Sequence, residues 1–369
     1  MIELKEKKER VILVGVSTSD QDDTLKSLEE LAELAATAGA ETAGMVVQNR
    51  EQMHPGTYVG KGKIEEIKDL LWEMDATGII CDDELSPVQM KNLQELLDTK
   101  VMDRTLVILD IFAARASTSE GKIQVELAQL KYRQSRLTGF GTAMSRLGGG
   151  IGTRGPGEKK LEMDRRLIRN RIAQLNRELK DVRRHREVTR EQRNRSHMPV
   201  AAIVGYTNAG KSTLLNTLTG ADILAEDKLF ATLDPTTREL KLPSGQSILL
   251  TDTVGFIRKL PHHLIEAFKS TLEEAKYADL ILHVVDTANP QMDEQMYTVY
   301  ETLTNLEVKD KPIITVFNKQ DLAEEGLIIR DFHADYTVKI SAKKGDGLSE
   351  LLQPIEAVLR EQKVFIEGV

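Results

Sequence analysis

The segment from Gly205 to Ser212 reads GYTNAGKS, which fits the phosphate-binding pattern GxxxxGK[ST]. An apolar run, 200–204, precedes it and a helical pattern, 213–218, follows it, as this pattern requires. In such a loop the backbone N–H groups surround a β-phosphate, Lys211 reaches the β- and γ-phosphates, and the Ser212 hydroxyl ligates Mg²⁺. The segment therefore predicts a nucleoside triphosphate site.

A second motif, Asp252-Thr-Val-Gly255, follows the apolar run 247–251. A carboxylate at Asp252 would support the metal ion and its water ligands, and the N–H of Gly255 could reach the γ-phosphate. The DxxG pattern is common in surface turns, so its position directly after an apolar strand carries the prediction.

A third motif predicts the base. Asn318-Lys-Gln-Asp321 follows the apolar run 313–317, and the Asp321 carboxylate can accept hydrogen bonds from N1–H and N2–H₂ of guanine. Adenine lacks both donors there, so the site should favour GTP over ATP. Asn318 could bridge the phosphate loop and the base, and the Lys319 stem could cover the ring.

A fourth segment, Ser341-Ala342-Lys343, follows the strand pattern 338–340 and could offer a backbone N–H to guanine O6. In order along the chain, the four motifs each fall at the carboxyl end of a predicted strand, where ligands bind in open α/β sheets. Together they predict a guanine nucleotide site.

The polar, turn-rich segment 230–238 (FATLDPTTR) lies between the first two motifs, as a nucleotide-sensing segment should. One threonine should reach Mg²⁺ and the γ-phosphate, and Thr232, Thr236 and Thr237 remain alternatives on this ground. We expect segments 226–238 and 252–265 to be ordered by GTP and released by hydrolysis.

Phe256 stands where many P-loop GTPases carry a glutamine that orients the attacking water. A phenyl ring cannot do so, and slow intrinsic hydrolysis is therefore expected, with another group or a partner positioning the water. Arg238 and Arg258 are candidates for a stabilising arginine, although both fit surface charges better.

Residues 1–118 alternate between short apolar runs and helical patterns, which predicts a parallel sheet with helical crossovers. The expected strands are 11–16, 42–47, 77–81 and 100–103, and the expected helices are 23–38, 63–74 and 87–97. The segment 56–63 (GTYVGKGK) departs from the phosphate-loop spacing, so we interpret it as a turn.

Residues 119–197 differ in composition. A helix is expected over 119–137, a loop with six glycines between 148 and 157, and a long helix over 158–195. Leu161, Ile168, Ile172, Leu175, Leu179 and Val182 form a coiled-coil pattern in the long helix. An antiparallel helical hairpin with a glycine-rich tip follows from these patterns. The composition changes again near 196–199, and a nucleotide-binding domain is expected over 198–369.

Charge is unevenly distributed. The chain has a formal net charge of −8, yet residues 131–195 contain 19 Lys and Arg against 7 Asp and Glu. A basic segment in an acidic protein indicates contact with a polyanion, or a solvated helix face. The single cysteine and scattered histidines argue against a zinc site and suit a reducing cytoplasm. No apolar run approaches the ~18 residues that span a bilayer.

These motifs resemble the HflX family of ribosome-associated GTPases over essentially the whole chain. The most specific parts are GYTNAGKS at 205–212, FATLDPTTR at 230–238, DTVGFI at 252–257 and GFGTAMSRLGGGIGTRGPGEKKLE at 139–162. The resemblance implies an N-terminal parallel α/β domain, an antiparallel helical hairpin and a C-terminal P-loop GTPase domain with a mostly parallel sheet. It also makes Thr232 the switch threonine and Mg²⁺ ligand, and treats Phe256 as normal for the group.

The resemblance further implies a protein that binds GTP and GDP and associates with the 50S ribosomal subunit and its rRNA. A monomer is expected, because the helix over 119–137 offers the coiled-coil pattern an intramolecular partner, although pairing between two chains is the alternative. Its activity would be splitting or rescue of ribosomes. Alternatives are a ribosome-assembly GTPase, or a regulatory GTPase whose hairpin binds a protein or a membrane surface.

The expected site combines these assignments. Lys211, Thr232 and Gly255 are expected to act in catalysis, and Ser212, Thr232 and Asp252 to hold Mg²⁺, Asp252 through water. The expected nucleotide contacts are Gly205, Tyr206, Thr207, Asn208, Ala209, Gly210, Lys211, Ser212, Thr213, Phe230, Ala231, Thr232, Leu233, Asp234, Asp252, Thr253, Val254, Gly255, Asn318, Lys319, Gln320, Asp321, Ser341, Ala342 and Lys343.

Overall fold

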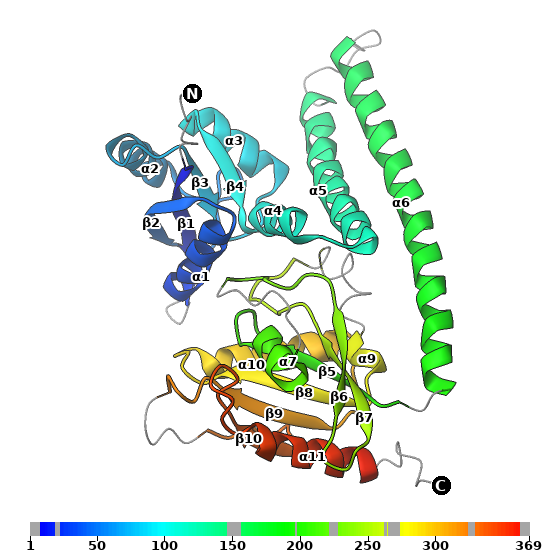
Figure 1. The fold of residues 1–369 in the computed structure, drawn as a ribbon. Helices are drawn as coiled ribbons and strands as arrows, with labels where there is room; N and C mark the ends of the chain where they lie inside the picture. Colours follow the sequence, from blue (N-terminus) through cyan, green and yellow to red (C-terminus); the bar gives the residue numbers. More distant parts are fainter. Residues whose placement is uncertain are drawn as a thin grey trace, which may run out of the picture. The chain divides into compact units, whose positions relative to one another are not determined.

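The computed structural model describes residues 8–18, 23–145, 156–195, 198–220, 228–261, 264, 274–323 and 329–361 (Figure 1). The chain divides into two compact units. The first comprises Met1–Ala114 and Ile123–Glu178, and the second comprises Arg115–Lys122 and Leu179–Val369. The expected glycine-rich tip lies mostly outside the described residues. Residues 226–227 of the first expected switch segment and residues 262–263 and 265 of the second also lie outside them.

The first unit is built on a four-stranded sheet in the order β2-β1-β3-β4, and every pairing is parallel. Its strands are β1 (Arg10–Ser17), β2 (Glu41–Asn49), β3 (Gly78–Cys81) and β4 (Lys100–Asp103), and its crossover helices are α1 (Thr24–Thr37), α2 (Lys61–Glu73) and α3 (Pro87–Leu97). All seven elements expected from the sequence are therefore confirmed, with ends shifted by a few residues at most.

Helices cover both faces of this sheet. Ile12, Val14 and Val16 of β1 share a core cluster with apolar residues of α2 and α3. Gly15 has the opposite parity, and a Cβ there would lie 2.7 Å from Thr24 of α1. Because side chains alternate across a strand, α1 covers the other face. Burial on both faces explains why the two central strands, β1 and β3, are nearly continuous apolar runs.

Helix α3 shows why one boundary was predictable to the residue. The Ser86 hydroxyl accepts from the N–H of Gln89, the Gln89 side chain accepts from the N–H of Ser86, and Pro87 occupies the first turn. This capping box satisfies backbone donors that would otherwise lack partners.

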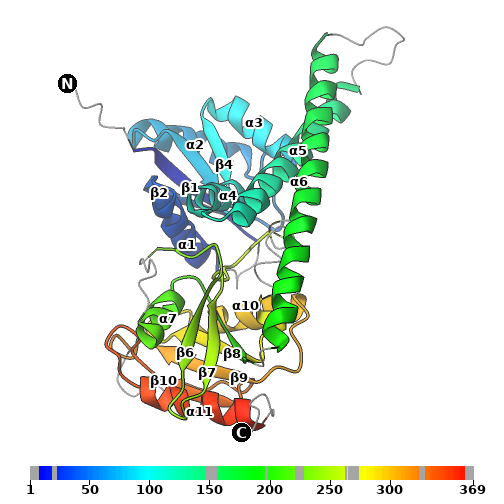
Figure 2. The ribbon, with the colours of Figure 1, turned by 45° about the vertical axis from the view of Figure 1, so that its right-hand side comes forward.

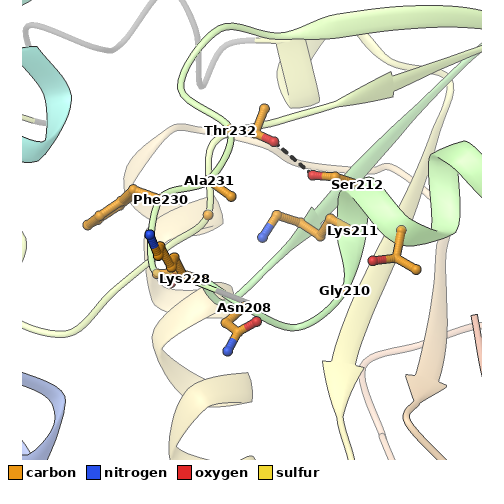
Figure 3. A pocket seen from close by; sticks show the side chains of 11 residues that line it. Asn208, Gly210, Lys211, Ser212, Lys228, Phe230, Ala231 and Thr232 are labelled. Atoms are coloured by element: carbon orange, nitrogen blue, oxygen red, sulfur yellow. Dashed lines mark hydrogen bonds between the residues drawn. The ribbon is translucent and has the colours of Figure 1, made fainter. Parts of the chain in front are cut away.

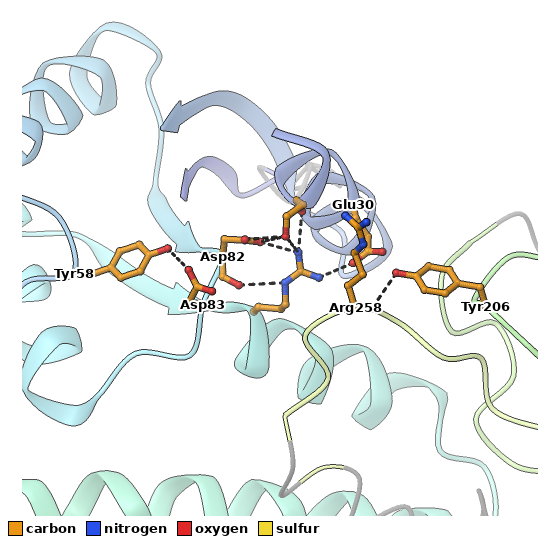
Figure 4. Close-up of polar contacts among 8 residues, drawn as sticks. Glu30, Tyr58, Asp82, Asp83, Tyr206 and Arg258 are labelled. Carbon is orange, nitrogen blue, oxygen red and sulfur yellow. Dashed lines mark hydrogen bonds and ion pairs between the residues drawn. The ribbon is translucent and has the colours of Figure 1, made fainter. Parts of the chain in front are cut away.

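Helix α4 (Arg104–Arg115) was not expected from the sequence, because its apolar residues are nearly continuous and show little helical periodicity. Its first residue, Arg104, is 1% exposed and pairs with Asp82 at 2.7 Å and Glu30 at 2.6 Å (Figure 4). A buried guanidinium needs such partners to offset its lost hydration. Burial opposes the charge of Arg104, but the two carboxylates outweigh it and raise its pKa.

Helices α5 (Ser119–Ser145) and α6 (Pro156–Arg195) run antiparallel over their described length in the first unit. Arg171 bonds both carboxylate oxygens of Glu126, at 2.7 and 2.8 Å, and Arg165 donates to the carbonyl of Leu137. The expected hairpin pairing is therefore present. Helix α5 continues to Ser145, so the expectation that it ends at Leu137 was wrong. The two glycines beyond Leu137, Gly139 and Gly141, each cost about 1 kcal/mol of helix propensity, which does not end a helix of this length.

The second unit contains a six-stranded sheet in the order β10-β9-β8-β5-β7-β6, parallel except for the β6–β7 pair. The strands are β5 (Val200–Gly205), β6 (Thr236–Lys241), β7 (Ser247–Asp252), β8 (Leu280–Asp286), β9 (Ile313–Asn318) and β10 (Tyr336–Lys339), and the helices are α7 (Lys211–Thr219), α9 (Glu274–Tyr277), α10 (Met292–Asn305) and α11 (Leu348–Glu361). The mostly parallel sheet predicted for this region is confirmed (Figure 2).

Helices α7 and α11 share one core cluster with inward side chains such as Val284 and Val316. The neighbouring residues Val285 and Phe317 pack instead with Met296 of α10, so α10 covers the opposite face. None of the described helices is long and apolar enough to cross a bilayer.

His283 of β8 is buried beneath α10 and predicts a pH effect on stability. Its ring packs edge-on against Tyr300, and its Nδ1 lies 4.0 Å from an Asp331 oxygen. Burial lowers the pKa of His283 to about 4. An unfolded chain, with a His pKa of about 6.5, takes up the proton first as the pH falls. Stability contributed by the neutral ring is therefore present above pH 6.5 and is lost between about pH 6.5 and 4.

We expect the wild type to lose about 2 kcal/mol more unfolding free energy than His283→Gln between pH 7 and pH 5. Urea unfolding followed by circular dichroism at both pH values measures the difference. Comparing the two proteins cancels the contributions of other titrating groups, including Asp252, whose pKa burial raises. Equal losses in both proteins would contradict the assignment.

Candidate nucleotide-binding site

The predicted phosphate loop joins β5 to α7, and glycine is required where it meets the helix. Gly210 caps α7 with a φ of 94°, a conformation that costs other residues about 1–2 kcal/mol. A Cβ on Gly210 would also lie only 2.3 Å from Nδ2 of Asn318. The sequence thus allows the loop to pass close against β9, where the third motif begins.

Lys211 is almost fully enclosed by this loop. Its side chain is 6% exposed, and its Nζ donates to the carbonyl of Tyr206 at 2.7 Å. Burial lowers the pKa of Lys211 to about 8, and the nearby Asp252 carboxylate opposes that effect. The fold therefore holds a cation with little hydration at the phosphate loop, which a phosphate group can compensate.

Three oxygen-bearing side chains meet at the start of α7. The Ser212 hydroxyl lies 2.7 Å from Oγ1 of Thr232 (Figure 3) and 2.6 Å from Oδ2 of Asp252. Asp252 is 0% exposed, and its Oδ1 has no hydrogen-bond partner among the described residues. An orphaned carboxylate oxygen beside two hydroxyls suits Mg²⁺, which prefers oxygen ligands. The expected metal ligands are thus brought together.

Thr232 lies at this cluster, whereas Thr236 and Thr237 begin the edge strand β6, where Thr237 bonds Thr251 at 3.0 Å. The choice among the three threonines, which the residue types left open, therefore favours Thr232. Among the described residues no group of three or more His, Cys, Asp or Glu side chains forms a metal site. The cluster of Ser212, Thr232 and Asp252 differs from such a group, because two of its three side chains are hydroxyls.

A cavity opens beside the loop. Most of its lining was expected from the sequence, namely Thr207, Asn208, Gly210, Lys211, Ser212, Thr213, Phe230, Ala231, Thr232 and Gly255. Lys228 also lines it and was missed, because no motif covers that position. A second cation here adds to the attraction for phosphate.

The base-recognition motifs lie at the ends of β9 and β10. Asn318 donates to the carbonyl of Ala209 and accepts from the N–H of Ala342, both at 2.9 Å. It thereby ties the phosphate loop to the segment after β10. Asp321 accepts a 2.7 Å hydrogen bond from the Ser341 hydroxyl, which is the main cause of its lowered pKa. Its carboxylate is therefore charged at neutral pH.

Other expected residues support the site from outside the cavity. Lys319 pairs with Asp286 at 2.7 Å, and Gln320 donates to Thr287 at 3.1 Å. The Thr253 hydroxyl donates to the carbonyl of Ile203. The remaining expected contacts outside the cavity lining are Gly205, Tyr206, Ala209, Leu233, Asp234, Val254 and Lys343.

Phe256 is 1% exposed and is held against the phosphate loop by backbone hydrogen bonds, to Gly205 at 3.1 Å and from Thr207 at 2.8 Å. The side chain belongs to the core, so it does not reach into the cavity. The backbone N–H of Arg258 donates to the Tyr206 hydroxyl at 2.8 Å (Figure 4). The Arg258 side chain forms an ion pair with Glu294. That pairing gives Arg258 a structural role in this arrangement, and Arg238 is exposed on the edge strand.

Comparison with known proteins agrees with this geometry. Three family descriptions match in succession: "GTP-binding GTPase N-terminal" at residues 25–113, "GTP-binding GTPase Middle Region" at 115–193 and "50S ribosome-binding GTPase" at 200–319. A GTPase HflX from Lacrimispora saccharolytica is 71% identical over all of this chain and 87% of its own length. One from Escherichia coli is 44% identical over 94% of this chain and 82% of its own length.

Among solved structures, the complex of SsGBP with GDP is 26% identical and covers 96% of this chain and 99% of that one, with a TM-score of 0.53. The order of the three matched regions, the identity to curated relatives and the phosphate loop agree: this chain belongs to the HflX family of GTPases and is a GTP hydrolase.

Proposed function

We propose that this chain is a magnesium-dependent GTPase that acts on the large ribosomal subunit, where it splits or rescues ribosomes. The observation that carries the catalytic part is the meeting of Ser212, Thr232 and Asp252 within hydrogen-bond distance beside the buried Lys211. The ribosomal part is supported by the matched region described as a 50S ribosome-binding GTPase and by the basic helix α6.

The residues divide the work of hydrolysis. Lys211 would neutralise charge on the β- and γ-phosphates, and the N–H of Gly255 would donate to the γ-phosphate. Ser212 and Thr232 would ligate Mg²⁺, with Asp252 behind them, and the metal would supply further charge neutralisation. Asp321 would select guanine. Because Thr232 belongs to a loop, loss of the γ-phosphate would release it.

Hydrolysis by the isolated protein should be slow. The buried Phe256 cannot hold an attacking water, and Arg258 is engaged by Glu294. Contact with the ribosome would then have to order the loops or supply the missing group. This dependence would limit GTP turnover to protein that has reached its target.

The domain organisation follows the same proposal: 1–118 as an α/β domain, 119–197 as a hairpin that reaches rRNA, and 198–369 as the GTPase domain, in a monomeric cytoplasmic protein. A role in ribosome assembly would use the same surfaces. A membrane-bound regulator is less consistent with α6, since residues 158–195 contain no Trp or Phe to enter a bilayer.

The test is GTP hydrolysis with and without purified 50S subunits at 50 and 200 mM salt. We expect 50S subunits to stimulate hydrolysis. If about six phosphates are contacted, the apparent affinity for 50S should fall by about 10³-fold from 50 to 200 mM salt. Arg166→Glu/Arg169→Glu, at exposed positions of α6, should reduce stimulation and leave the intrinsic rate unchanged. Absence of stimulation, with pelleting on anionic vesicles instead, would overturn the ribosomal part.

A further inference from the structure

The loop that carries Thr232 is held by hydrogen bonds to the carboxylate of Asp234, two residues further along the chain. Its Oδ2 accepts from the backbone N–H groups of Ser117 and Thr118, both at 2.9 Å, and from the Ser117 hydroxyl at 2.7 Å. Its Oδ1 accepts from the Thr118 hydroxyl at 2.5 Å. All four donors belong to the short segment Arg115–Lys122, which is part of the same compact unit as Asp234.

The two donor residues, Ser117 and Thr118, immediately precede α5. The Thr118 hydroxyl accepts from the N–H of Gly121 at 2.9 Å, and the Thr118 carbonyl accepts from the N–H of Lys122 at 3.0 Å. Thr118 is thus the N-cap. Its hydroxyl accepts a hydrogen bond from the first helical turn and donates one to the carboxylate of Asp234. A carboxylate is also favoured there by the helix dipole.

The packing at this contact requires glycine at position 121. A Cβ on Gly121 would lie 2.4 Å from Oδ1 of Asp234 and 3.1 Å from Oγ1 of Thr118. Alanine would otherwise be the better residue inside a helix. The carboxylate of Asp234 therefore occupies space that only a missing side chain leaves open.

The contact bears on the metal cluster because the chain between them is short. Only Leu233 separates Asp234 from Thr232, and it is buried, so the two Cα atoms can be no more than about 7 Å apart. Burial opposes the charge of Asp234, but the four hydrogen bonds outweigh it and lower its pKa. The carboxylate is charged at neutral pH and keeps its full strength as an acceptor.

We propose that Asp234 is a positioning residue, which binds the start of α5 at Ser117 and Thr118 and thereby holds Thr232 beside Ser212 and Asp252. The inference rests on the proposed role of Thr232 as a ligand of Mg²⁺. It assigns Asp234, expected from its motif to contact the nucleotide, to a different task. It also makes the first turn of α5 a part of the GTP-sensing apparatus.

The test uses the full chain and measures the affinities for a non-hydrolysable GTP analogue and for GDP across a series of Mg²⁺ concentrations. Asp234→Ala removes the acceptor, and Gly121→Ala fills the space of its carboxylate without changing any residue of the loop. Both should raise the Mg²⁺ concentration needed for half-maximal binding of the analogue by about 10-fold, and leave GDP affinity within about two-fold. Thr232→Ala should show the same pattern.

Gly62→Ala is the matched control, because Gly62 lies inside α2 and a Cβ there meets no atom within 4 Å. It should leave both affinities unchanged. If Thr232→Ala shifts the Mg²⁺ dependence and Asp234→Ala does not, the positioning role is overturned while the metal ligand stands. If Thr232→Ala has no effect, the ligand assignment fails, and the inference with it. An equal loss of GTP-analogue and GDP affinity in Asp234→Ala would show a general structural role instead.

Discussion

Replacement of Lys211 by methionine is expected to reduce GTP hydrolysis by about 10²-fold or more, while making the nucleotide-free protein more stable. The ammonium group supplies charge neutralisation that a thioether cannot. The same group destabilises the folded state, because burial disfavours its charged form and lowers its pKa to about 8. An unfolded lysine has a pKa near 10.4, so the folded state holds the proton less tightly.

The sign of the stability effect follows from that difference. Below pH 8 both states are protonated, and the folded state carries the full penalty of the buried charge. As the pH rises from 8 to 10.4 the penalty is relieved, so wild-type stability should rise relative to Lys211→Met. After allowance for the lost hydrogen bond to Tyr206, we expect a gain of about 1–2 kcal/mol for the variant at pH 7.

Single-turnover hydrolysis and urea unfolding of the nucleotide-free protein measure the two effects. Lys228→Met is the matched control, because Lys228 lines the same cavity but is exposed. Its removal should leave the unfolding free energy unchanged. A Lys211→Met protein that is less stable than the wild type at pH 7 would show that the buried charge of Lys211 does not destabilise the folded state.

Motifs that depend on a short stretch of chain were predictable from the sequence. The phosphate loop could be recognised because Gly210, Lys211 and Ser212 must occupy fixed positions between a strand and a helix. Buried parallel strands such as β1 were equally clear, because both faces are covered and the run is uniformly apolar. In each case the local pattern and the tertiary environment impose the same requirement.

Strands were harder to predict where the tertiary environment alone determines whether a segment forms a strand. Strand β8 is central in its sheet, yet it carries His283 in the middle of its apolar run, and no turn motif marks its ends. Strand β6 lies at the edge with mostly polar residues, TTRELK, so its alternation does not distinguish it from a loop. It forms because β7 offers a free edge for antiparallel pairing.

The site shows the same division. Ser212 and Asp252 could be placed from their motifs, but Thr232 could not be separated from Thr236 and Thr237 by residue type alone. The partner of Asp234 was beyond reach, since Ser117 and Thr118 are more than a hundred residues away in sequence. Such a contact leaves a local trace only in Gly121, and a single glycine in a helix does not indicate which distant side chain it accommodates.

Replacement of Asp321 by asparagine is expected to transfer the base preference from guanine to xanthine. The carboxylate of Asp321 would accept from both N1–H and N2–H₂ of guanine, and loss of two charge-assisted hydrogen bonds should weaken GTP binding by about 100-fold or more. Xanthine keeps N1–H but carries a carbonyl oxygen at C2. An asparagine side chain can accept from the first and donate to the second, so XTP should become the better substrate.

Competition binding of GTP, XTP and ATP to the wild type and to Asp321→Asn measures this change in base preference. Ser341→Ala is the informative companion variant, because the Ser341 hydroxyl only orients the carboxylate, at 2.7 Å. It should weaken GTP binding by roughly ten-fold and bring no gain for XTP. ATP should stay weak throughout, since adenine has no N1–H. If Asp321→Asn lost GTP and XTP alike, the base would have to be read by other groups, and the first candidates would be the backbone after β10 and the stem of Lys319.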